Sequence, residues 1–224
     1  MELAAAAVIG FVFVRIQLAL PAPLLPVDLL RIPVFALSVT TSVVSFAAQM
    51  LAYLALPFYF HDVLGRSVAE TGGLMTPWPI AIAFAAPLAG RLADRYSPGV
   101  LGGLGLGLLA LGLVLLALLP AAPSNGDIVW RLAICGFGFG LFQTPNNKAI
   151  VTSAPPERSG GASGMQSTAR LLGQSLGAAL VAVIFGLSSS QPTGTVLWVA
   201  AGLSSLGCLS SLLRRSKGGT SLQA

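Results

Sequence analysis

The sequence predicts an all-α membrane protein, and three observations support this prediction. Charged residues make up only 8% of the 224 residues, against about 25% in a soluble domain. Hydrophobic residues make up 55%, and the mean hydropathy is +0.85. The few charges also leave long uncharged runs at 32–60, 71–90, 96–126, 132–147 and 171–213. Such a chain cannot cover a soluble globule with polar groups, and its hydrophobicity excludes intrinsic disorder.

The uncharged runs are long enough for helices that cross a bilayer. A spanning helix needs about 20 predominantly apolar residues, whereas barrel strands alternate over about 10 residues. Loops rich in Pro, Ser, Asn and Gly at 120–127 and 188–194 end or divide the longest runs. We therefore expect six spans, at about 33–60, 71–93, 98–119, 128–151, 162–187 and 194–213. Prolines within the second and fourth of them permit bends, at Pro77, Pro79, Pro87 and Pro145.

The residues before the first span are too short for a span of their own. Residues 3–14 are apolar, but a signal peptide would have a basic start and a small-residue cleavage site, and neither is present. We expect 1–14 to be the end of a truncated transmembrane helix, with a short interfacial helix as the alternative. The chain then divides into a cytoplasmic linker at 15–32, a six-span domain at 33–213 and a cytoplasmic tail at 214–224.

The basic residues predict the orientation of the spans. Only Arg66 and Arg131 fall on one side of the predicted membrane. The other side holds ten of the 12 Lys and Arg, namely Arg15, Arg31, Arg91, Arg95, Lys148, Arg158, Arg170, Arg214, Arg215 and Lys217. Because cytoplasmic loops are enriched in Lys and Arg, we expect an inner (plasma) membrane protein whose six-span unit has both ends in the cytoplasm. This explanation of the positive charge makes the lipid bilayer the expected partner, and no nucleic acid is expected.

The sequence does not favour an enzyme. Cys135 and Cys208 lie in apolar runs, which indicates small buried residues rather than a disulfide or a metal pair. The chain has one His and no Cys/His cluster, so we expect no metal site, no cofactor and no catalytic residue. The glycine-rich segment 136–140 follows no strand, so it does not indicate a dinucleotide site.

Polar residues recur on one face of three predicted spans. The faces are Ser38, Ser42, Ser45, Gln49 and Tyr53 in the first span; Cys135, Phe139, Phe142, Gln143 and Asn146 in the fourth; and Gln166, Arg170, Gly173, Gln174 and Gly177 in the fifth. They could form hydrogen bonds between helices, at about 0.6 kcal/mol per pair, or line a water-filled cavity. We favour the cavity because three spans carry such faces, although Arg170 could instead reach the headgroups. The expected cavity residues are Gln49, Tyr53, Phe142, Gln143, Asn146, Arg170 and Gln174.

The segment Gly90-Arg91-Leu92-Ala93-Asp94-Arg95 lies between the second and third predicted spans, on the predicted cytoplasmic side. It resembles the motif G-x-L-A-D-R of the major facilitator superfamily, although the basic run that often follows that motif is absent. Asp94 would lie near the positive end of the next helix, and Arg95 could pair with an acid across the cytoplasmic side. The resemblance implies a cytoplasmic gate formed by Gly90, Asp94 and Arg95; a plain positive loop is the alternative.

Further segments resemble a narrower group. FQTPNN at 142–147, PERSGGASG at 156–164 and the residues around Arg170 to Gly177 resemble the C-terminal half of fourteen-helix drug:proton antiporters. The likeness is strongest to exporters of quaternary ammonium compounds and methyl viologen. LLPVDLLR at 24–31 resembles the linker before their ninth helix. The resemblance covers nearly the whole chain, and it implies that 3–14 ends helix eight and that the six spans are helices nine to fourteen.

This resemblance implies a six-helix half-domain of a multidrug efflux permease, which exports small lipophilic or cationic drugs in exchange for protons. The N-terminal half of such a permease, with its usual proton-coupling carboxylates, is missing here and is the expected partner. The alternatives are a transporter half for another substrate and a membrane fragment with no transport activity.

Overall fold

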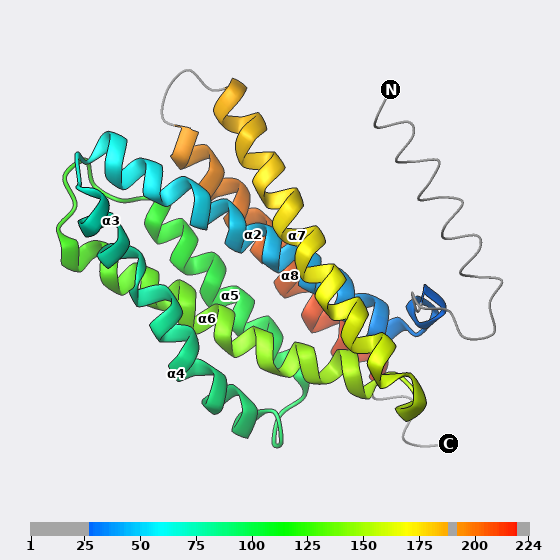
Figure 1. The fold of residues 1–224 in the computed structure, drawn as a ribbon. Helices are drawn as coiled ribbons and strands as arrows, with labels where there is room; N and C mark the ends of the chain where they lie inside the picture. The colour runs from blue at the N-terminus through cyan, green and yellow to red at the C-terminus, as the bar shows by residue number, and fades with distance from the viewer. Residues whose placement is uncertain (1–26, 188–191, 219–224) are drawn as a thin grey trace, which may run out of the picture.

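The structure, a computed structural model, describes residues 27–187 and 192–218, and the side chains as far as Arg214. Every regular element in these ranges is helical, which confirms the predicted all-α fold (Figure 1). The elements are η1 (Val27–Arg31), α2 (Pro33–Phe58), η2 (Tyr59–Val63), α3 (Val68–Met75), α4 (Pro77–Leu92), α5 (Pro98–Ala117), α6 (Asn125–Thr152), η3 (Pro156–Arg158), α7 (Ser159–Leu187) and α8 (Pro192–Gly218). The helix predicted at 1–14 and most of the linker lie outside the described residues.

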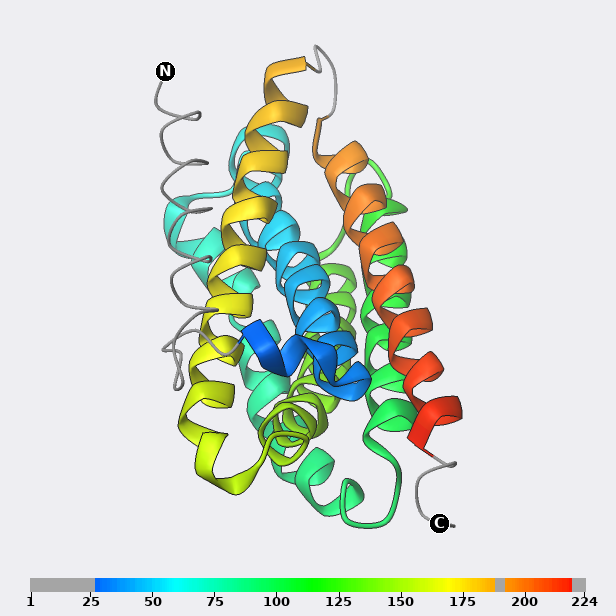
Figure 2. The ribbon, with the colours of Figure 1, turned by 90° about the vertical axis from the view of Figure 1, so that its right-hand side faces the viewer.

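The described helices correspond in order to the predicted spans. Five segments are long and apolar enough to cross a membrane: Pro33–Val63, Val68–Leu92, Pro98–Ala117, Pro156–Leu187 and Pro192–Arg214. The fourth predicted span is α6, which has 28 residues but is not among these five segments. Polar residues such as Gln143 and Asn146 make α6 less apolar, although it lies within the bundle with the other helices (Figure 2).

The helices pack in an order that differs from the chain order. α4 packs on α6, α6 on α5, α5 on α8, α8 on α2 and α2 on α7, while α2 also contacts α6. The turns from α4 to α5 and from α6 to α7 lie at the same end of the bundle as the end of α8 (Figure 1). We call this the basic end, because Arg91, Arg95, Lys148, Arg158 and Arg214 lie there.

Two predicted boundaries differ from the structure. The second span is broken into α3 and α4 at Thr76, whose N–H donates to the Gly73 carbonyl at 3.3 Å, a three-residue step. Pro77 has no N–H for the four-residue bond that would continue the helix. The tail predicted to start at residue 214 instead continues α8 to Gly218, because Arg214 is buried in the bundle.

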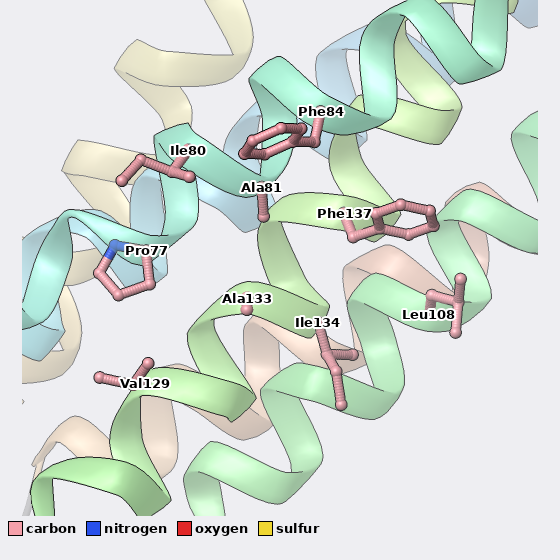
Figure 3. Close-up of a pocket in the computed structure, with 9 residues that line it drawn as sticks. All are labelled: Pro77, Ile80, Ala81, Phe84, Leu108, Val129, Ala133, Ile134 and Phe137. Atoms are coloured by element: carbon pink, nitrogen blue, oxygen red, sulfur yellow. The ribbon is translucent and has the colours of Figure 1, made fainter.

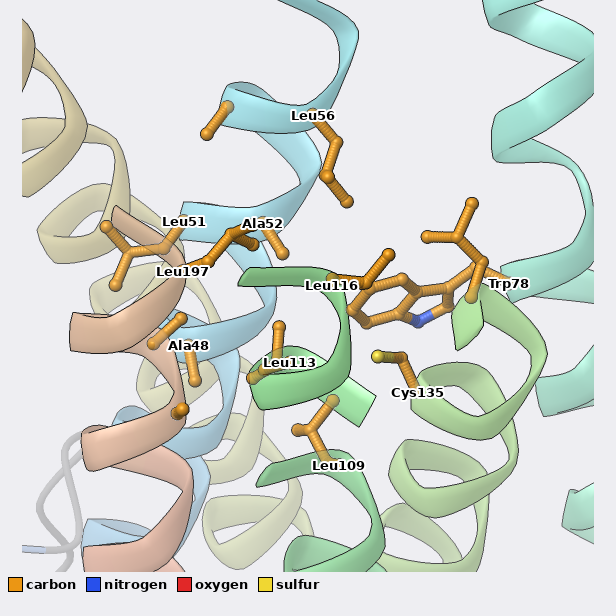
Figure 4. Packing of buried hydrophobic residues seen from close by; sticks show 14 of the residues in the cluster. Ala48, Leu51, Ala52, Leu56, Trp78, Leu109, Leu113, Leu116, Cys135 and Leu197 are labelled. Atoms are coloured by element: carbon orange, nitrogen blue, oxygen red, sulfur yellow. The ribbon is translucent and has the colours of Figure 1, made fainter. Parts of the chain in front are cut away.

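The main core lies where α2, α4, α5, α6 and α8 meet. Trp78 of α4 is fully buried there beside Leu113, Leu116 and Cys135 (Figure 4). A smaller apolar cluster at the basic end holds Leu29 of η1 against α2, α6 and α7. The Arg158 guanidinium of η3 donates to both carboxylate oxygens of Asp28, at 3.0 and 3.2 Å, so the end of the predicted linker is fixed to the bundle.

Glycines bring α6 close to its neighbours on two sides. A Cβ on Gly138 would lie 2.6 Å from both the Gly105 carbonyl oxygen and the Leu109 nitrogen of α5. A Cβ on Gly136 would meet the Trp78 carbonyl, and one on Gly140 would lie 2.8 Å from the Ala85 Cβ, both on α4. The glycine-rich segment of α6 is therefore explained by helix packing, since small residues allow membrane helices to approach closely.

A groove of about 630 Å³ lies between α4 and α5, above the outer face of α6 (Figure 3). Its lining is apolar throughout: Pro77, Ile80, Ala81, Phe84, Leu108, Val129, Ala133, Ile134 and Phe137. The Phe84 side chain is 74% exposed. These residues suit contact with lipid hydrocarbon, and they share none of the predicted cavity residues.

Candidate functional site

The polar face of α2 is used in two ways, and its half nearer the basic end joins helices. The Asn146 side-chain amide of α6 donates to the Ser42 hydroxyl at 2.8 Å and to the Ser38 carbonyl at 3.3 Å. Asn146, Ser38 and Ser42 are all buried. For these residues the interpretation as helix–helix hydrogen bonding is therefore correct.

Arg214 of α8 completes this polar cluster. Its Nη1 donates to the Ser38 hydroxyl at 2.6 Å and to the Asn146 side-chain carbonyl at 2.7 Å, and its Nη2 donates to the Ser211 hydroxyl at 2.6 Å. The residue is 6% exposed, and it forms no ion pair within the described part of the chain. This role of Arg214 was not predicted from the sequence, where the one local signal is Ser211, three residues earlier on the helix.

The glutamines of the predicted cavity behave differently from Asn146. Gln49 of α2, Gln143 of α6 and Gln174 of α7 are half-buried, and their amides form no hydrogen bond with any described residue. An amide left in hydrocarbon without a partner costs several kcal/mol. Because α2, α6 and α7 contact one another, these three amides favour a shared surface that faces water or a ligand.

Tyr53 and Arg170 lie on two of the same helices. The Tyr53 ring is half-buried and packs edge-to-face on Trp78, with ring centroids 5.0 Å apart and an interplanar angle of 70°. Arg170 is exposed on α7 and has no ion pair among the described residues. Its neighbours Leu171 and Leu172 are exposed as well, so this stretch of α7 is not covered by the bundle.

Phe142 and Asn146 do not share this exposure. Phe142 is 1% exposed in the main core and lies against Gly105 of α5, while Asn146 is fully buried by its contacts with α2 and α8. Their spacing along α6 predicted that Phe142 and Asn146 would share a face with Gln143. In the structure both side chains instead lie between packed helices. We therefore define the candidate surface as Gln49, Tyr53, Gln143, Arg170 and Gln174.

The gate motif has a partner that the sequence did not identify. The Lys148 ammonium of α6 donates to the Asp94 carboxylate at 2.8 Å and so links the α4–α5 turn to α6. The hydrogen bond and charge of Lys148 hold the pKa of Asp94 below its usual value. Arg95 is exposed and has no ion pair with a described residue. A Cβ on Gly90 would meet nothing within 4 Å, so packing inside the bundle does not require this glycine.

Reversing the Lys148 charge should weaken transport by a permease completed with an N-terminal half, because Lys148→Glu places two carboxylates together. The double variant Asp94→Lys/Lys148→Glu should recover most of the lost rate. Since the Asp94 pKa is lowered, the native pair should persist from pH 7 to 5 and break only as the pH falls below the usual Asp value of about 3.9. Export rates at pH 7 check the charge reversal.

The control is Ser163→Glu, which adds the same charge at an exposed position of α7, where the hydroxyl donates only to its own helix. This variant should keep the wild-type rate. A double variant no better than Lys148→Glu alone would show that the pair does not act as a gate contact.

The sequence of this chain is similar to those of known membrane transporters. The sequence profile of the Major Facilitator Superfamily matches residues 4–178. The uncharacterized transporter YebQ of Escherichia coli K12 is 58% identical over 212 residues, which cover 94% of this chain and 46% of YebQ. The riboflavin transporter RibZ of Clostridioides difficile is 31% identical over 140 residues, covering 62% of this chain and 31% of RibZ.

A third relative matches the resemblance to methyl viologen exporters. The methyl viologen resistance protein SmvA of Salmonella typhimurium LT2 is 27% identical over 191 residues, which cover 85% of this chain and 38% of SmvA. The chain thus spans less than half the length of each of these three relatives. The resemblance first indicated by residues 90–95 is confirmed over most of the chain. The chain therefore belongs to the Major Facilitator Superfamily, as part of a membrane transporter and not of an enzyme.

Proposed function

We propose that this chain forms the C-terminal half of a multidrug efflux permease, which exports lipophilic organic cations by proton antiport. The observation that supports this most is the candidate surface, where Tyr53 and three glutamine amides without a hydrogen-bond partner among the described residues lie on mutually packed helices. An aromatic ring attracts a flat cation through its π face. The oxygens of the glutamine amides can replace the water molecules that surround such a cation in solution. The similarity to SmvA, a methyl viologen resistance protein, supports an organic cation as substrate.

The second half of the permease is part of this proposal. In this family the substrate site lies between two halves related by an axis along the membrane normal, so the candidate surface would form one wall. The acidic residues of the described chain are Asp28, Asp62, Glu70, Asp94, Asp127 and Glu157, and all of them lie near helix ends or in turns. The N-terminal half would then supply the carboxylate that carries the proton, with both ends of this unit in the cytoplasm of an inner-membrane protein.

A second candidate is transport of a neutral planar metabolite. RibZ, named a riboflavin transporter, is 31% identical over 140 residues, and amides can bind a polar ring system by hydrogen bonds. The two candidates differ in the charge of the substrate. Arg170, the exposed cationic member of the candidate surface, would disfavour a cation close to it and tolerate a neutral ring.

Expression in a drug-sensitive bacterium without its own pumps tests the proposal. Residues 1–224 alone should insert into the membrane without giving resistance. Co-expression with the N-terminal half of YebQ should give resistance to methyl viologen and proton-dependent efflux of ethidium. Export of riboflavin but not of ethidium would favour the second candidate, and proton-dependent dye efflux by purified residues 1–224 alone would overturn the half-transporter proposal.

A further inference from the structure

The clearest unexplained feature of the bundle is a buried arginine that has no carboxylate partner among the described residues. Arg214 donates three hydrogen bonds, all to neutral oxygens on Ser38, Asn146 and Ser211. Its Nε is buried without an acceptor among the described residues. A charged side chain inside a membrane bundle is expensive to bury, and such residues mark functional positions.

The surroundings of Arg214 are shaped to receive its guanidinium group. A Cβ on Gly102 of α5 would lie 2.6 Å from the Ser211 hydroxyl and 3.2 Å from Arg214 Nη2. The Ser211 hydroxyl donates to the Gly99 carbonyl at 3.0 Å. The cluster therefore joins α8 to α2 and α6 directly, and to α5 through Ser211.

Residues of this cluster are close in sequence to residues of the candidate surface, on both α2 and α6. Asn146, which accepts from Arg214 and donates to Ser42, is three residues from Gln143, about one turn of α6. Ser42 is seven residues from Gln49, about two turns of α2. The same contacts that bind Arg214 thus fix the register of α2 against α6 just before the unpaired glutamines.

We propose that Arg214 is a positioning residue that acts through Asn146 to set the spacing of Gln49 and Gln143 for substrate. This rests on the proposed function of the candidate surface. The guanidinium suits the role because its planar fork reaches acceptors on two other helices at once, which a Lys ammonium cannot match in geometry. Removing it leaves Asn146 with an unfilled acceptor and breaks the hydrogen bonds of the guanidinium to α2 and α6, while α8 keeps its other contacts with α2.

We call the hydrogen bonds of Arg214 to Ser38 and Asn146 the clamp. The native thiol of Cys208 tests the clamp without any transport measurement. Cys208 is half-buried on α8, six residues before Arg214, and donates to the Gly103 carbonyl at 3.1 Å. In a Cys135→Ala background, Arg214→Gln should raise the alkylation rate of Cys208 roughly fivefold, because local opening exposes the thiol. Arg214→Lys should stay closer to wild type, and Arg31→Gln, which removes an exposed charge at the same end, should change nothing.

Transport by the permease completed with the YebQ N-terminal half separates positioning from mere stability. Arg214→Gln should raise KM about tenfold while Vmax per inserted molecule stays within about twofold, the pattern of lost substrate binding. Asn146→Ala should do the same, and the double variant should add little, since both act through one contact. Arg214→Lys should restore part of the KM.

The alkylation rate of Cys208 and the KM for transport contradict different parts of the proposal. Wild-type Cys208 reactivity in Arg214→Gln would overturn the clamp itself. A changed reactivity with an unchanged KM, or with Vmax falling in step with the inserted amount, would overturn the positioning role and leave a structural one. If wild-type chains transport no cation, the proposed function fails, and with it the role toward substrate, while the Cys208 rates still decide the clamp.

Discussion

Replacing Gly105 by alanine should strongly destabilise the bundle, because the added methyl group would press α5 away from α6. The added Cβ would lie 2.5 Å from the Phe142 nitrogen and 2.6 Å from the Gly138 carbonyl oxygen. Both are backbone atoms, so relief requires α5 and α6 to separate. Overpacking of a core costs about 1–3 kcal/mol, and we expect the upper end of that range. The free energy of unfolding of residues 1–224 in detergent, followed by tryptophan fluorescence, measures it.

Gly107 gives a matched control in the same helix. A Cβ there would meet only the Cys208 sulfur, at 3.8 Å, which is ordinary contact. Gly107→Ala should therefore be neutral or stabilise the helix by about 0.5 kcal/mol, because alanine loses less backbone entropy than glycine. If both variants unfold at the same denaturant concentration, close contact between α5 and α6 is not what holds this part of the bundle together.

Cysteines placed at Gln49 and Gln143 should react rapidly with a charged, water-soluble thiol reagent. The measurement uses the permease completed with an N-terminal half and lacking Cys135 and Cys208. Both positions are half-buried, and their amides have no partner in the described ranges, so we expect them to face water. The thiolate is the nucleophile that attacks such a reagent, and it forms readily only where water solvates the side chain. The rates should exceed those of the controls by on the order of tenfold, and a lipophilic cation should slow them.

The controls separate water from packing and from lipid. Ser45→Cys lies one turn from Gln49 on α2 and is fully buried, so it should be protected by neighbouring helices. Leu172→Cys is 53% exposed on α7, where we expect lipid, so it should also react slowly. Equal rates at all four positions would remove the distinction between the candidate surface and the remaining polar face of α2.

The long uncharged runs were enough to predict the helices and most of their limits, because the bilayer admits few other structures. Local chemistry explains the exceptions. α3 begins at Val68, before the predicted residue 71, because Ser67 and Glu70 form a capping box. Pro77 breaks the second span, whereas α6 continues through Pro145. The sequence shows that prolines are present, but tertiary contacts decide which of them interrupts a helix.

The candidate site was only partly predictable. Helical spacing grouped Gln143 with Asn146. Asn146 is paired with residues 104 and 68 positions away, whereas Gln143 has no such partner in the part of the chain that the structure describes. Spacing along one helix does not say which neighbour a side chain will meet. Arg214 followed a long apolar run, where a terminal charge usually reaches the headgroups. Its contact with Ser38, 176 residues earlier, could not be read from either segment alone.

The polar face of α2 also bears on the order in which the membrane bundle is assembled. The ribosome makes α2 first among the long helices described here, long before Asn146 or Arg214 exists to pair with it. Meanwhile the Ser38 and Thr41 hydroxyls donate to the Val34 and Leu37 carbonyls of the preceding turn, at 2.7 and 2.6 Å. Such local bonds let a helix enter lipid with its hydroxyls satisfied. α2 can therefore be inserted early, while its final register waits for α8, the last of these helices to leave the ribosome.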